Sequence, residues 1–242
     1  MARLLEQYVD APKSCVYLPA ETATTETCIM LDVSPAEYGH MMSRGWRRFG
    51  PIYFRPACGA CTECVSIRVP LHRFAPSKSQ RRAAKRARSL RRAVGVPVVD
   101  DARLALYSRW HADREHERGW GPSNESAQSY ALSFAFPHPS VREVTFYDGE
   151  RLVGVGIWDE VPGAASAVYF YSDPDYAAWS LGVANVVVYV EEARARGLDY
   201  VYLGYRVLGC ASLAYKAKYR PHELLAGRPS FEEEPRWVAD PG

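Results

Sequence analysis

Hydrophobic patterning predicts three β-strands in the second half of the chain. The runs 141–147 and 151–158 are rich in Val and aromatic residues, and Asp148 and Gly149 lie between them. Asp-Gly between two such runs is a typical hairpin turn. A third run of the same kind spans 165–171. We therefore expect an antiparallel sheet of at least three strands.

Helical spacing occurs on either side of these strands. Apolar residues recur every three or four positions through 181–196, Gly197 follows where helices commonly end, and 200–205 returns to a strand pattern. Earlier in the chain, 101–118 predicts an amphipathic helix. Its inward residues are expected to be Leu104, Tyr107, Trp110 and His111. Three antiparallel strands, a helix and a further strand form an order that resembles the core of the GNAT acyltransferases.

The first 69 residues predict a different kind of structure, because Pro and Gly interrupt the apolar runs and leave short strands and turns. Ser77 and Gln80 then form a capping-box signature, and no Gly or Pro follows until Gly95. A helix over 78–94 is therefore expected.

The predicted fold class is α+β, with a GNAT-like acyltransferase core in the C-terminal domain and a small cysteine-rich, metal-binding N-terminal domain. The predicted parts are an N-terminal domain at 1–76, a basic connecting helix at 77–97, and a GNAT-like domain for aminoacyl transfer at 98–242. Gly95 to Pro97 is the expected boundary between the helix and the last domain.

Charge is distributed unevenly along this pattern. The whole chain carries +2, but residues 44–92 contain 14 of the 30 Lys and Arg and a single acid, Glu63. That segment therefore carries +13 and the remainder −11. Arg81, Lys85, Arg88 and Arg92 fall at spacings of four, three and four and share one face of the predicted helix. Since so many like charges repel one another unless a polyanion is near, we expect nucleic acid as a partner.

Cysteine spacing predicts a metal centre. Cys58, Cys61 and Cys64 are each three residues apart, and Cys15 supplies a fourth thiolate, with Cys28 as its alternative. Four thiolates suit zinc or an iron-sulfur cluster, and the spacing does not choose between the two. The first ten residues lack a signal-peptide pattern, and no apolar run approaches the roughly 20 residues of a membrane span. The expected location is cytoplasmic, with no membrane partner.

Two further groups of residues suggest chemistry. Arginines alternate with aromatic rings at Trp46, Arg47, Arg48, Tyr53 and Arg55, a combination that binds phosphate and stacks on unpaired bases. A second group gathers at the ends of the predicted strands and would line a cleft. Its members are Tyr169, Tyr171, Asp173, Tyr205, Tyr215 and Lys216.

The loop that binds acetyl-CoA in GNAT enzymes is incomplete. Gly182 and Ala184 occupy its small positions, but Trp179 stands where a basic residue usually holds the pyrophosphate. Acetyl-CoA is therefore not expected as a cofactor.

Taken together, these motifs resemble the aminoacyl-tRNA protein transferases, that is, the arginyltransferases and the bacterial aspartate/glutamate leucyltransferases. The resemblance rests on CVYLP at 15–19, GWRR at 45–48, YFRPAC at 53–58, SIRV at 66–69, FAPSKSQRR at 74–82, YFYSDP at 169–174, SLG at 180–182, LGY at 203–205, YK at 215–216 and RP at 220–221. Together they cover nearly the whole chain.

The resemblance implies transfer of an amino acid, Leu or Arg, from aminoacyl-tRNA to an N-terminal acidic residue of a protein, which marks that protein for degradation. The residues expected to bind tRNA are Arg47, Arg48, Arg55, Lys78, Gln80, Arg81, Arg82 and Lys85. The residues expected at the transfer site are Asp173, Tyr171, Tyr205 and Lys216, with Asp173 as proton acceptor or amine holder.

Three alternatives remain open on the sequence. The chain departs from the bacterial pattern at Trp179 and within 208–214, which lacks the expected basic residues, so a relative acting on a peptide or small-molecule amine is one alternative. An acetyl-CoA-dependent N-acyltransferase is the second. A non-catalytic RNA-binding metal protein, supported by the basic segment alone, is the third.

Overall fold

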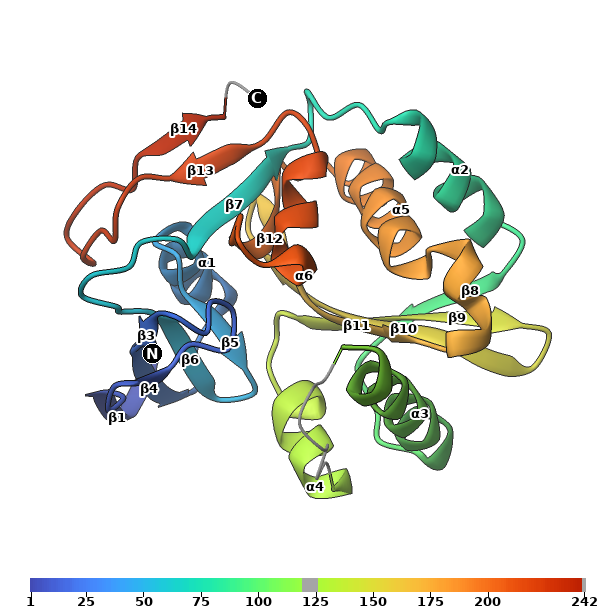
Figure 1. The fold of residues 1–242 in the computed structure, drawn as a ribbon, viewed down its shortest axis with the longest axis horizontal. Helices are drawn as coiled ribbons and strands as arrows, with labels where there is room; N and C mark the ends of the chain where they lie inside the picture. Colours follow the sequence, from blue (N-terminus) through green and yellow to red (C-terminus); the bar gives the residue numbers. More distant parts are fainter. Residues whose placement is uncertain (119–125, 241–242) are drawn as a thin grey trace.

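The computed structural model describes residues 1–118 and 126–240, and an eight-stranded sheet lies at its centre (Figure 1). Its spatial order is β14-β13-β7-β12-β11-β10-β9-β8. In chain order the strands are β7 (Val65–Pro70), β8 (Arg91–Gly95), β9 (Val141–Asp148), β10 (Arg151–Val161), β11 (Ala164–Ser172), β12 (Tyr200–Arg206), β13 (Glu223–Leu225) and β14 (Trp237–Ala239).

The predicted order of elements in the second half of the chain is confirmed. Strands β9, β10 and β11 are successive antiparallel neighbours, with Gly149 at φ +57° in the first turn. The helix α5 (Leu181–Ala195) then leads to β12, which runs parallel to β11. Gly197, just beyond α5, has φ +77°, the left-handed conformation that favours glycine after a helix.

Helices cover both faces of the sheet (Figure 1). On one face α5 packs between the sheet and α2 (Lys78–Ala87). Tyr189 of α5 stacks on Trp158 of β10, with ring centroids 3.7 Å apart. Helix α5 is buried on most sides, so the burial of apolar side chains such as Val186 and Val187 stabilises it despite their low helical preference. On the other face lie α3 (Asp101–Arg118), α4 (Ala127–Tyr130) and the π-helical turn η1 (Ala131–Ala135).

The predicted helix over 78–94 is too long. Its capping box is present, since the Ser77 hydroxyl accepts from the Gln80 amide and the Gln80 side chain accepts in return. However, α2 ends at Ala87, and Arg91–Gly95 forms the edge strand β8 beside β9. A free sheet edge offers backbone hydrogen bonds that outweigh the helical preference of these residues.

A second sheet is formed by the first part of the chain. Its order is β1-β4-β6-β5, and its strands are β1 (Arg3–Val9), β4 (Thr25–Leu31), β5 (Arg47–Phe49) and β6 (Ile52–Pro56). The short ribbon β2 (Lys13–Ser14) and β3 (Thr22–Ala23) and the helix α1 (Pro35–Ser43) complete this region. Sequence patterning missed α1, although Ser34, Pro35 and Glu37 make a capping box with Pro at the first turn.

The two predicted domains share a sheet. Strand β7 lies within the predicted N-terminal part, yet it pairs with β12 on one side and β13 on the other. A hydrophobic cluster that includes Tyr38, Trp46, Val161 and Tyr202 also joins the two regions. Short elements complete the fold: η2 (Pro174–Trp179), α6 (Ala211–Ala214) and η3 (Tyr215–Lys218). In the described ranges, no helix is both long and apolar enough to span a bilayer.

Candidate active site

The two central strands of the large sheet separate at one end. Strands β11 and β12 pair over three positions only, from Ala164 to Ser166. Each strand is irregular near this point. In β11, Val168 is an extra residue relative to β10, and β12 shifts register against β7 between Tyr202 and Tyr205. Such bulges bend strands and redirect side chains, often beside active sites. A cavity of about 170 Å³ lies where the strands have parted.

The lining of this cavity combines positive charge with aromatic surface. Its charged residues are Arg47, Arg48 and Lys216, and none of the lining residues is Asp or Glu. Phe49 and Phe54, with ring centroids 5.5 Å apart, form an apolar wall on the side of β5 and β6. The cavity therefore has a cationic part and an apolar part.

Arg47 is buried at the β12 side of the cavity. Its Nη1 donates to the Trp46 carbonyl at 2.6 Å, and its Nη2 donates to the Ser66 hydroxyl. The guanidinium also lies 5.3 Å and 5.5 Å from the ring centroids of Tyr202 and Tyr205. All these partners are neutral, so among the residues that the structure describes no carboxylate compensates the charge of Arg47.

Arg48 has the opposite electrostatic environment. Its guanidinium makes an ion pair with the Asp159 carboxylate, which is fully buried, and donates to the Gly50 carbonyl at 3.0 Å. Arg48 itself is 4% exposed. Its charge is compensated within the protein, which leaves little of it for the tRNA phosphate contact predicted from the sequence.

Lys216 reaches the cavity from η3. A Cβ at Gly204 would lie 3.2 Å from the Lys216 Nζ, and Gly204 has φ +77°, so this position suits glycine on both counts. Burial, together with the nearby positive charge of Arg47, lowers the pKa of Lys216 to about 8. Among the described residues, no carboxylate pairs with its ammonium group.

The other residues of the predicted transfer site separate into two places. Tyr205 lines the cavity and donates from its hydroxyl to the Gly45 carbonyl at 2.7 Å. Tyr171 lies outside it, in the cluster beneath α3, where its hydroxyl is 2.6 Å from that of Tyr130. Burial raises the pKa of both Tyr171 and Tyr205, so both hydroxyls are neutral and serve as hydrogen-bonding groups.

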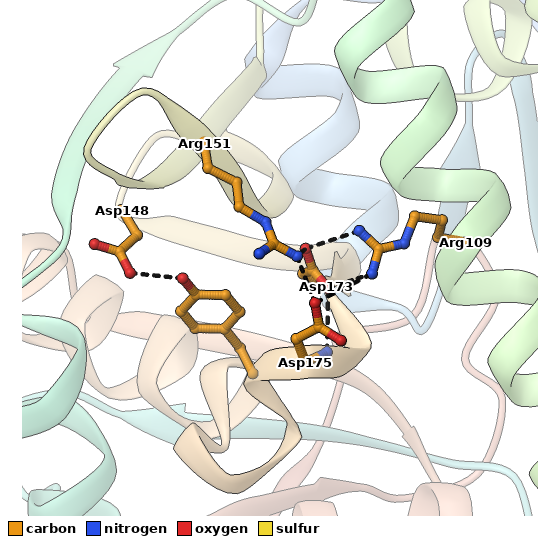
Figure 2. A network of polar contacts seen from close by, with 6 residues as sticks. Arg109, Asp148, Arg151, Asp173 and Asp175 are labelled. Atoms are coloured by element: carbon orange, nitrogen blue, oxygen red, sulfur yellow. Dashed lines mark hydrogen bonds and ion pairs between the residues drawn. The ribbon is translucent and has the colours of Figure 1, made fainter.

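Asp173 is also outside the cavity, at the end of β11 (Figure 2). Its two carboxylate oxygens accept from Arg109 at 3.0 and 3.1 Å and from Arg151 at 2.5 Å, and Asp175 shares both arginines. One oxygen also accepts from the Asp175 amide, which makes Asp173 the N-cap of η2. The carboxylate is thus saturated by cations and a backbone donor, and this geometry does not bring it to Tyr205 or Lys216.

The exposed face of α2 carries half of the predicted tRNA contacts. Lys78, Arg81, Arg82 and Lys85 are exposed there. Arg82 and Lys85 line an open hollow together with Arg86 and Trp179 of η2, while Arg86 holds η2 in place by donating to the Ala178 carbonyl. This surface is accessible to a polyanion.

Two residues of the predicted tRNA set have structural partners instead. Gln80 is buried, closes the capping box and donates to the Lys218 carbonyl at 3.1 Å. Arg55 pairs with Glu26 at 2.7 Å and covers the ring of Trp46 at 4.8 Å. Both hold elements together around the cavity.

The four cysteines predicted to bind metal line a separate cavity of about 100 Å³. They are Cys15, Cys58, Cys61 and Cys64, all free thiols. Burial raises the pKa of the Cys64 thiol to about 12, and the other three thiols add to this effect. Cys28 lies in β4, outside this cavity.

The donor set around this cavity has the chemistry of a zinc or iron-sulfur site, but its arrangement is not that of a formed one. Within 1–118 and 126–240, no group of three or more His, Cys, Asp or Glu side chains is placed to hold one ion. The predicted metal-binding N-terminal domain is therefore not supported by the geometry as it stands.

Several residues that build the site were not identified from the sequence. Asp159 and Ser166 lie in strands with a mostly apolar pattern, and Arg109 and Arg151, which pair with Asp173, were not singled out. Asp159 carried one usable signal, because an acid in a buried strand needs a buried cation.

The order of strands and helices, the cavity between β11 and β12 and the exposed basic face of α2 fit the acyltransferase predicted from the sequence. Family comparisons specify the class further. The family model described as "Arginine-tRNA-protein transferase, N terminus" matches residues 13–82, and the one described as "Arginine-tRNA-protein transferase, C terminus" matches 102–226.

Relatives match over the full length. The aspartate/glutamate leucyltransferase of Helicobacter hepaticus is 32% identical over 236 residues, which cover 97% of this chain and 98% of that protein. The enzyme of the same name from Chromobacterium violaceum is 35% identical over 222 residues, 91% of this chain and 90% of that protein. The chain therefore belongs to the arginine-tRNA-protein transferase family, and it is an aminoacyltransferase.

Solved structures are similar only in part. The C-terminal domain of a putative lysylphosphatidylglycerol synthetase from Agrobacterium fabrum superposes with a TM-score of 0.47 at 15% identity, over 73% of this chain and 58% of that one. The ribosomal-protein-S18-alanine N-acetyltransferase of Escherichia coli gives 0.32 at 18% identity, over 45% and 63% of the two chains. Likenesses at this level establish no shared activity.

Proposed function

We propose that this chain transfers leucine from leucyl-tRNA to the α-amine of an N-terminal aspartate or glutamate of a protein. In this reaction the amine nitrogen attacks the ester carbonyl carbon, a C–N bond forms, and the bond to the ribose oxygen of the tRNA breaks. The amine loses a proton and the ribose oxygen gains one. Addition of leucine would then mark the acceptor for degradation.

The observation that carries the choice of leucine is the absence of any acid in the lining of the cavity. An arginyl side chain would bring a third uncompensated cation beside Arg47 and Lys216. A leucyl side chain would instead contact Phe49, Phe54 and Leu213. The full-length relatives that are named leucyltransferases support the same choice.

The separated strands supply a place for the ester. Beyond Ser166 the facing backbones of β11 and β12 no longer pair with each other. Peptide N–H groups that lack a strand partner can donate to a carbonyl oxygen as negative charge develops on it. The ester is already activated, so orienting the amine and stabilising this oxygen provide much of the catalysis. Tyr205, anchored at Gly45, keeps β12 in position.

The exposed face of α2 is proposed to hold the tRNA. Lys78, Arg81, Arg82 and Lys85 place four positive charges on one accessible surface. The hollow between α2 and η2 adjoins this surface, and a second hollow lined by Ser77 and Ser180 lies at the N-terminal ends of α2 and α5. Trp179, which replaces the basic residue of acetyl-CoA enzymes, offers a ring for stacking against a base.

Zinc or an iron-sulfur cluster remains a separate, structural proposal. Cys15, Cys58, Cys61 and Cys64 would hold it, because all four thiols face one cavity. A bound centre would fix the hairpin of β2 and β3 against the loop that precedes β7.

The test incubates the protein with a pool of aminoacyl-tRNAs, each amino acid labelled in turn, and peptides that differ only in the first residue. Labelled leucine should appear on Asp and Glu peptides and on no others. Transfer of arginine, consumption of acetyl-CoA without RNA, or tight tRNA binding without transfer would each overturn the proposal in a different way.

A further inference from the structure

Two cations in the active-site cavity have no carboxylate partner within residues 1–118 and 126–240. Arg47 donates only to neutral oxygens, and Lys216 has no ion pair among the described residues. Arg48, in the same cavity, shows the contrast, because Asp159 compensates it. The aromatic rings of Tyr202 and Tyr205 offset part of the Arg47 charge.

The placement of these cations is specific. The Arg47 guanidinium reaches the carbonyl of Gly204 at 3.5 Å, and the Lys216 Nζ lies beside the same glycine. Both groups therefore converge on the bulge of β12. Because the two cations approach the same glycine, their charges repel each other, and a bound anion would relieve this repulsion.

We propose that Arg47 and Lys216 bind the side-chain carboxylate of the acceptor's N-terminal aspartate or glutamate, and so determine acceptor specificity. This inference rests on the proposed function and assigns the acceptor half of the same site. In an N-terminal acidic residue, a side chain of only one methylene in Asp or two in Glu separates the carboxylate from the α-carbon that carries the amine. A carboxylate held at Gly204 therefore leaves the amine beside the separated strands, where the ester would lie.

The same geometry explains why a neutral residue would be a poor acceptor. An amide side chain, as in asparagine, fits the same space but compensates neither charge. Binding it would leave two cations enclosed without a counter-ion, and that difference discriminates between otherwise isosteric acceptors. A terminal phosphate of the tRNA is the competing anion, but the exposed face of α2 already offers phosphates a solvated site.

The test measures kcat/KM at saturating leucyl-tRNA for four peptides that differ only in an N-terminal Asp, Asn, Glu or Gln. Lys216→Met removes the charge and keeps the length of the side chain, and Lys216→Arg keeps the charge. Lys13→Gln is the matched control, because Lys13 pairs with Asp10 at the surface, outside the cavity. Melting temperatures verify that each variant is folded.

Lys216→Met should lower kcat/KM for the Asp and Glu peptides about 10- to 100-fold, the range for losing one hydrogen bond to a charged group. The Asn and Gln peptides should change by less than about threefold, so the preference for acids largely disappears. Lys216→Arg should retain most of the preference for acidic over amide acceptors, and Lys13→Gln should retain all of it.

Three outcomes would overturn the inference. An equal loss on all four peptides would place Lys216 in a step common to every acceptor. A weaker Kd for leucyl-tRNA with an unchanged acid preference would assign the cations to phosphate. Full retention of the preference by folded Lys216→Met would remove Lys216 from recognition. Failure of the wild-type protein to transfer leucine to any of the four peptides would instead refute the proposed function.

Discussion

Arg48→Met should strongly destabilise the protein, because Arg48 and Asp159 form a buried ion pair between the two sheets. Arg48 belongs to β5 of the small sheet, Asp159 belongs to β10 of the large one, and they are 111 residues apart. Arg48 is 4% exposed and Asp159 is 0% exposed. Without the arginine, the Asp159 carboxylate would be buried without a counter-ion.

The expected loss is about 3–5 kcal/mol, the range for removing one partner of a buried pair. With a urea m-value of roughly 2–3 kcal/mol/M, the unfolding midpoint should fall by on the order of 1 to 2 M. The double variant Arg48→Met/Asp159→Leu should lose less than the sum of the single variants, because neither charge then remains buried.

Urea unfolding followed by tryptophan fluorescence and circular dichroism checks both statements. Arg88→Met is the control, since the Arg88–Glu191 pair is exposed and should contribute less than about 1 kcal/mol. If Arg48→Met costs no more than this control, or if the single changes are additive in the double variant, the two sheets are not held by this pair.

Four further results are expected. Arg82→Glu/Lys85→Glu should weaken tRNA binding at least tenfold and reduce the salt dependence of binding, measured by filter binding; an unchanged salt slope would remove this face of α2 from the interface. Cys61→Ser should reduce the metal content of protein purified without oxygen, and equal content in both proteins would refute the metal proposal. Burial lowers the pKa of His138 to about 3, so the unfolded state gains a proton first as pH falls from about 6.5; stability should decline through that range, and His138→Gln should flatten this decline. Asp173→Asn should lower stability by about 1–3 kcal/mol, because it weakens the pairing of two arginines, and should leave single-turnover transfer within a few fold; a loss of 10²-fold would restore Asp173 as proton acceptor.

Local patterns in the sequence determined the elements whose hydrogen bonds are local. The Asp148-Gly149 turn predicted the hairpin of β9 and β10, and Gly197 predicted the end of α5. The capping box at Ser77 predicted where α2 begins. Motifs of neighbouring residues also determined the family, because matches that follow one another in order do not depend on how the chain folds.

Tertiary structure decided everything that depends on partners distant in the chain. The end of α2 was set by the sheet edge that β8 joins, and β7 became part of the large sheet because β12 and β13 lie on either side of it. Charge followed the same rule. Arg47 and Arg48 are adjacent and chemically identical, yet in the described part of the chain only Arg48 contacts a carboxylate, from 111 residues away. The sequence determines which side chains are charged, but only long-range contacts determine which charges are paired. Arg48, which is paired, stabilises the fold, whereas Arg47, which is not, is proposed to bind a substrate.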